Sequence, residues 1–94
     1  MSDLTFTGLV TSITDIDRAA VLAVGRQAQQ VLSLRNWLIG TWIVTFEQGG
    51  ADRALYGDEL LDGLAESLRA AGTTGLSARN LRNCRQVALA FPHP

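Results

Sequence analysis

The chain has 94 residues, with eight basic and nine acidic side chains, a formal net charge of −1 and one cysteine. Its length suits one small domain rather than several. All eight basic residues are arginine, which excludes the lysine chemistry of Schiff-base enzymes and of Walker-type nucleotide sites. Because the chain is not basic overall, it can bind nucleic acid only through a local patch.

The cysteine and the N-terminus indicate the compartment. Cys84 has no second cysteine with which to form an internal disulfide, as is typical of a reducing cytoplasm. The N-terminus lacks a basic region followed by an apolar run, and no window reaches the roughly 18–20 apolar residues of a membrane-spanning helix. We therefore expect a cytoplasmic protein that is neither secreted nor inserted into a membrane.

The first half of the chain predicts a long helix with a short lead-in. Residues 1–14 have apolar side chains at spacings that suit either an N-terminal arm or a short helix, and both alternatives stay open. Thr14 or Asp15 is a candidate N-cap for one helix over residues 15–48, in which apolar residues recur at steps of three, four or seven. Such a helix would be about 50 Å long. A break near Ser33 is the alternative, and residues 15–94 form a single helical domain in either case.

Three residues of this segment predict contacts with other helices. A glycine inside a helix costs about 1 kcal/mol relative to alanine, so we interpret Gly40 as a point where another helix approaches closely. Trp37 and Trp42 point about 140° apart at 3.6 residues per turn, so one narrow core cannot bury both. Two flanking helices could cover them, or one could anchor an interface. Because the long helix also exceeds the domain that must cover it, we expect a homodimer with Trp37 and Trp42 at its interface.

A second helix is predicted over residues 58–71, after Gly49 and Gly50 end the first. Asp58 and Glu59 occupy its positive end, and Gly72 closes it. Its expected buried face consists of Leu60, Leu61, Leu64, Ala65 and Leu68. The acidic residues of the outer face are typical of a solvated helix and do not indicate a metal site.

The last predicted helix covers residues 77–91 and follows the short turn Gly72–Gly75. Ser77 is the expected N-cap, and Leu76 before it can pack on Leu81. Pro92 stops the helix. Its expected buried stripe consists of Leu81, Cys84, Ala88 and Phe91.

The opposite face of this helix is the candidate DNA-binding surface. Its residues are Arg79, Arg82, Asn83 and Gln86, with Asn80 and Arg85 on the flanks. Arginines and amides are the side chains that reach phosphates and base edges in a DNA groove, and no acidic residue lies between Gly72 and the C-terminus. Two helices joined by a short glycine-containing turn are typical of a helix-turn-helix, although plain helical bundles share this pattern.

The run from Asn36 to Pro92 also shares motifs with a known family. They are Ile39-Gly40, Glu47-Gln48-Gly49-Gly50, Arg53-Ala54-x-Tyr56-Gly57, Gly75-Leu76-Ser77-x-x-Asn80-Leu81 and Phe91-Pro92. Through them the chain resembles the N-terminal domain of the bacterial YhcG-type PD-(D/E)XK nuclease family over some three-fifths of its length. The resemblance implies a helical, DNA-binding domain of winged-helix or helix-turn-helix character, with the nuclease core in a separate C-terminal domain.

Two functions are consistent with these observations. The first is a non-catalytic targeting domain that binds double-stranded DNA through residues 77–91, without a cofactor, a metal or a catalytic residue. The second is a helical homodimerisation or protein-interaction module without direct DNA contact. A nuclease core needs a lysine in its acid, acid-x-Lys signature, and this chain has none. A stand-alone hydrolase is also excluded, because no nucleophile and base can be placed around the only histidine, His93.

Overall fold

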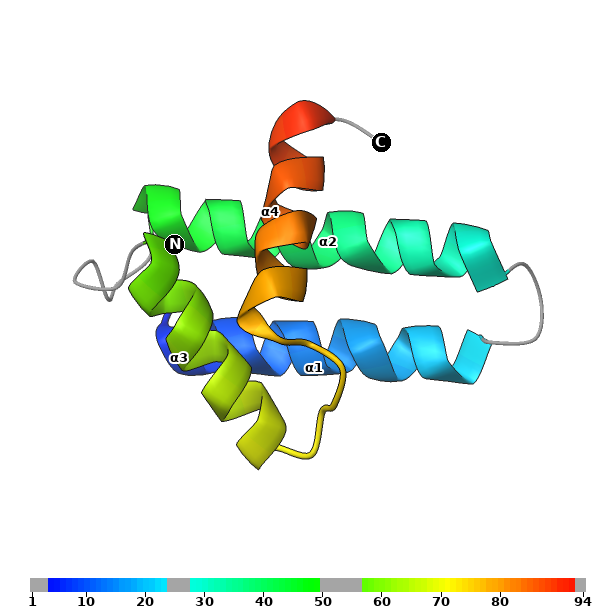
Figure 1. Ribbon diagram of the computed structural model, residues 1–94, viewed down its shortest axis with the longest axis horizontal. Coiled ribbons are helices and arrows are strands. Elements are labelled where there is room, and N and C mark those ends of the chain that lie inside the picture. Colours follow the sequence, from blue (N-terminus) through cyan, green and yellow to red (C-terminus); the bar gives the residue numbers. More distant parts are fainter. Residues whose placement is uncertain (1–3, 24–27, 50–56, 93–94) are drawn as a thin grey trace.

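The computed structural model describes residues 4–23, 28–49 and 57–92. Within these ranges the chain forms four helices and no strand: α1 Phe6–Ala23, α2 Ala28–Gly49, α3 Gly57–Ala70 and α4 Ala78–Ala90. The predicted all-α class is therefore confirmed. Helices α1 and α2 lie side by side, α4 crosses α2, and α3 packs against α1 and α4 (Figure 1).

The single long helix predicted over residues 15–48 is wrong. Helix α1 ends at Ala23, α2 begins at Ala28, and the two helices pack against each other. Ser33, where a break was the alternative, lies inside α2, and the candidate caps Thr14 and Asp15 lie inside α1, which begins at Phe6. The physical reason is burial, because two antiparallel helices cover each other's apolar stripes whereas one extended helix would leave its stripe in water.

One hydrophobic core joins the four helices. It contains residues from each helix and from the turn before α4: Leu9, Ile13, Ile39, Ile43, Phe46, Leu60, Leu61, Leu64, Leu68, Leu76, Leu81 and Cys84. The aliphatic side chains of α3 supply four of these positions, so the predicted buried face of that helix is confirmed, with Ala65 partly buried at its edge. This core fixes the position of α4 relative to α2 and α3.

The turn between α3 and α4 uses two glycines. Gly72 and Gly75 have φ angles of 91° and 83°, in the left-handed region that favours glycine. The amide of Thr73 donates to the carbonyl of Leu68, which satisfies an otherwise free carbonyl at the end of α3. Helix α3, this short turn and α4 therefore follow one another in the order that the sequence predicted.

Helix α4 begins as expected but ends differently. The Ser77 hydroxyl accepts from the backbone amide of Asn80, and Leu81, Cys84 and Ala88 are buried. Phe91 is 65% exposed, so its assignment to the buried stripe is wrong. The reason is the helix end: Phe91 is the C-cap residue with φ −130° and ψ 75°, so helical periodicity no longer sets the direction of its side chain.

Candidate nucleic-acid interface

The solvent face of α4 collects four of the six predicted DNA-binding residues. Arg79, Arg82, Asn83 and Gln86 are exposed. They follow one another at intervals of three, one and three residues, which places them along one side of the helix. The helix has no acidic residue in its first turn. This strip of two guanidinium groups and two amides is called the α4 face below.

Arg79 differs from the other arginines of α4 because it has no carboxylate partner in the part of the chain that the structure describes. Arg82 donates to Asp58 in the first turn of α3 at 2.9 Å, and both side chains are largely open to solvent. An exposed ion pair of this kind contributes little to stability and can exchange partners. Arg82 can therefore leave Asp58 for another anion, such as a phosphate.

Arg85 is held in a different way. Its Nε donates to Glu47 of α2, and the two side chains are only 31% and 11% exposed. The second carboxylate oxygen of Glu47 accepts from the backbone amide of Gly57 at the start of α3, at 3.3 Å. Glu47 thus joins three helices, and Arg85 serves this junction rather than the solvent face.

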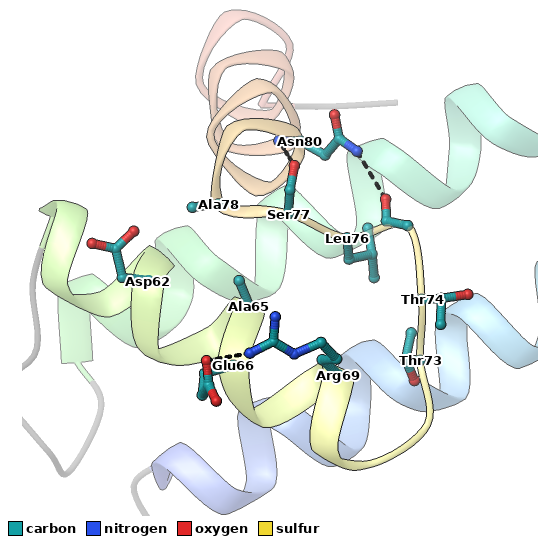
Figure 2. Close-up of a pocket in the computed structure, with 11 residues that line it drawn as sticks. Asp62, Ala65, Glu66, Arg69, Thr73, Thr74, Leu76, Ser77, Ala78 and Asn80 are labelled. Carbon is teal, nitrogen blue, oxygen red and sulfur yellow. Dashed lines mark hydrogen bonds and ion pairs between the residues drawn. The ribbon is translucent and has the colours of Figure 1, made fainter.

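Asn80 also has an internal role. Its side-chain amide donates to the carbonyl of Gly75 at 2.8 Å while its backbone amide donates to Ser77 (Figure 2). Both bonds stabilise the turn that leads into α4. The structure therefore brings the six predicted residues together on one helix, but it engages Asn80 and Arg85 in contacts within the protein.

The sequence interpretation missed Glu47 and Asp58 as neighbours of this surface. These residues lie 38 and 24 positions before the arginines they bind, so no local spacing rule connects them. The first turn of α3 lies beside Arg82, because the core packing of α3 against α4 brings their ends together.

A hollow beside the start of α4 is a weaker candidate for binding phosphate. It lies between α3 and the turn (Figure 2). Its volume is about 520 Å³, and its polar lining includes Asp62, Glu66, Arg69, Thr73, Ser77 and Asn80. Its one cationic side chain, Arg69, is bound to Glu66 at 2.6 Å. Because two carboxylates outnumber that cation, the hollow disfavours an anionic ligand.

Two further observations limit the chemistry of the described residues. They contain no group of three His, Cys, Asp or Glu side chains placed to hold a metal ion, and no helix among them is both long and apolar enough to cross a membrane. Cys84 is buried in the core, and this burial raises the pKa of its thiol. A buried neutral thiol is a packing residue rather than a nucleophile.

The two tryptophans have different surroundings. The indole nitrogen of Trp37 donates to the carbonyl of Phe91 at the end of α4, and the side chain is half-buried. Trp42 is 36% exposed. They therefore do not share one core, and Trp42 remains available at the surface.

The fold places the chain in the class of small all-α domains, and a short turn joins its helices α3 and α4. Residues 12–94 match the family described as the DUF1016 N-terminal domain, and the chain belongs to that family. It is 47% identical over 55 residues to "Putative nuclease YhcG" of Escherichia coli (strain K12), an alignment that covers 58% of this chain and 15% of that protein. The expected membership of the YhcG-type family is thereby confirmed. No solved structure matches the chain.

Proposed function

We propose that this chain is a non-catalytic DNA-binding domain of a YhcG-type nuclease and that it contacts double-stranded DNA through the α4 face. The observation that supports this function best is the exposed strip of Arg79, Arg82, Asn83 and Gln86 on a helix without acidic residues. Family membership and the name of the relative supply a nuclease context. The catalytic core would belong to another part of such a protein, since this chain has no lysine for the nuclease signature.

Each residue has a distinct proposed role. Arg79 and Arg82 bind phosphates, and Arg82 exchanges Asp58 for a phosphate oxygen when it does so. Asn83 and Gln86 reach base edges if α4 enters the major groove. Arg85 and Asn80 act indirectly, because Arg85 holds α4 against Glu47 and Asn80 stabilises the turn before the helix.

The test is a fluorescence-anisotropy titration of a random-sequence duplex at two salt concentrations. The Arg79→Ala/Arg82→Ala double variant should bind more weakly at low salt and should lose about two units from the log–log salt slope, since each phosphate contact contributes roughly −0.9. Arg69→Ala is the matched control, because Arg69 is also an exposed, ion-paired arginine but lies on α3. Equal affinity of the double variant and the parent would remove the DNA-binding proposal.

A homodimerisation module is the second candidate function. It is favoured by the exposed Trp42 and by an apolar groove between α1 and α2 that the folded chain leaves open. The two functions use different surfaces and can coexist in one protein.

A further inference from the structure

Arg82 and Arg85 lie on the same flank of α4, and each is bound to a carboxylate of another helix. They are three residues apart, which places Arg85 about 60° around the helix from Arg82 and about one turn further along it. Arg82 donates to Asp58 of α3, and Arg85 donates to Glu47 of α2. Two neighbouring arginines of the candidate DNA-binding helix are therefore both neutralised within the folded chain.

The two carboxylates differ in how firmly they are held. The Asp58 side chain is 79% exposed, so water and salt compete for Arg82. The Glu47 side chain is only 11% exposed, and its second oxygen also accepts from the Gly57 amide. A phosphate can therefore displace Asp58 from Arg82. Displacing Glu47 from Arg85 would instead leave a poorly hydrated carboxylate without its counter-charge, which is costly.

Arg85 itself is close enough to the surface to reach an anion. Its side chain is 31% exposed, and its Nε donates to Glu47. A guanidinium group has five N–H donors, so one bond to a carboxylate does not use its full capacity. If its partner carried no charge, Arg85 could turn outward to a phosphate beside the one proposed for Arg82. The charge of Glu47 is therefore the feature that keeps Arg85 in place.

We propose that Glu47 is a positioning residue of the DNA-binding surface, which holds Arg85 away from the phosphates and limits α4 to the phosphate contacts of Arg79 and Arg82. Phosphate contacts carry no sequence information, and each one strengthens binding to every duplex alike. Withholding Arg85 therefore lowers the sequence-independent part of the affinity and leaves a larger share of binding to the two amides of the α4 face. This inference rests on the proposed DNA-binding function and deepens it.

The test is a fluorescence-anisotropy titration of a random-sequence duplex with the 94-residue chain at about 50 and 200 mM salt. Glu47→Gln keeps the shape of the side chain but removes its charge, which releases Arg85. The variant should bind more tightly than the parent at the lower salt concentration, and its log–log salt slope should be steeper by about 0.9, the value of one phosphate contact. Its advantage over the parent should then shrink about 3.5-fold between the two salt concentrations. A loss of fold stability alone would weaken binding without adding a contact.

Two controls separate the release of Arg85 from a change in net charge. Glu66→Gln also removes one negative charge but frees Arg69 on α3, so it should leave the slope unchanged. The double variant Glu47→Gln/Arg85→Gln has the net charge of the parent and no released guanidinium group, so its slope should return to the parent value. Circular dichroism at the titration temperature verifies that each variant is folded. A slope that stays steep in the double variant, or that steepens equally in Glu66→Gln, overturns the inference.

A second comparison does not depend on the stability of Glu47→Gln. In the otherwise unchanged chain, Arg82→Gln should flatten the salt slope by about 0.9, whereas Arg85→Gln should not flatten it. Equal flattening by the two variants would show that Arg85 already binds a phosphate, and this overturns the inference while the DNA-binding proposal stands. A folded Glu47→Gln variant with the slope of the parent has the same consequence. A parent that does not bind the duplex removes the DNA-binding proposal and this inference together.

Discussion

The backbone carbonyl of Cys84 lies directly against Gly40, where α4 crosses α2. A Cβ placed on Gly40 would stand 1.9 Å from the Cys84 oxygen, 2.6 Å from its carbonyl carbon and 2.9 Å from the Cβ of Ala88. Two of these three atoms belong to backbone, which cannot move aside as a side chain can. The close approach that the sequence predicted at Gly40 is confirmed, and it is the contact that sets the spacing of the two helices.

Gly40→Ala should therefore destabilise the fold. The added methyl group forces α2 and α4 apart, and overpacking of this kind costs about 1–3 kcal/mol, more than the roughly 1 kcal/mol that alanine gains over glycine in a helix. Gly63→Ala in α3 is the control, because its Cβ would meet only Phe6, at 3.9 Å. Urea denaturation should show a lower midpoint for Gly40→Ala and an unchanged or higher midpoint for Gly63→Ala. Equal midpoints for Gly40→Ala and the parent would contradict the close crossing.

Glu47→Gln should also lower stability. The substitution removes the negative charge from a carboxylate that binds Arg85 and accepts from the Gly57 amide in a largely buried position. Loss of a partner for a poorly exposed charged group costs about 1–3 kcal/mol. Glu66→Gln is the matched control, since the Glu66–Arg69 pair is about 70% exposed on each side and such pairs contribute little. Equal melting temperatures for the two variants would show that the three-helix junction at Glu47 does not stabilise the fold.

Cys84 gives a prediction about pH. Burial raises the pKa of its thiol in the folded protein, while the positive charge of Arg35 opposes the rise. The unfolded chain therefore loses this proton first as the pH increases above the ordinary thiol pKa of about 8.5. Stability is fully present below that pH and declines as the pH rises toward the folded-state pKa. Unfolding free energies measured from pH 7 to 10 should fall less steeply for Cys84→Ala than for the parent. Parallel curves for the two proteins would be evidence against this linkage.

Asp58→Asn should strengthen the proposed DNA binding. The substitution removes a carboxylate that competes with phosphate for Arg82 and lies beside the α4 face. Because the pair is exposed, the gain should be modest, about two- to five-fold at low salt, and it should shrink as salt is added. Glu66→Gln on α3 is the control, since Glu66 binds Arg69 instead. A tighter complex with Glu66→Gln but not with Asp58→Asn would place the DNA on a different face.

Local signals in the sequence were sufficient for the second half of the fold. The glycines at residues 72 and 75, the Ser77 cap and the leucine spacing of α3 each act within a few residues, and the structure confirms all of them. The close helix contact at Gly40 could also be predicted from the sequence, because a glycine inside an apolar helix usually indicates close packing against another helix. The candidate residues of α4 were also identified from the sequence, because helical spacing places the arginines and amides on one face of the helix and the apolar residues on the other.

Contacts between distant residues were decided only by the tertiary structure. The apolar spacing of residues 15–48 fits one helix as well as two. Only the packing of α1 on α2 shows that the chain forms two helices. The pairing of Arg85 with Glu47 and of Arg82 with Asp58 depends on how the core orients α2, α3 and α4. Helix propensity and capping act over about one turn, whereas burial and ion pairing act between segments that meet only in the folded chain. The sequence by itself therefore determined which helix carries the candidate residues, and the tertiary structure decided which of those residues remain free to bind.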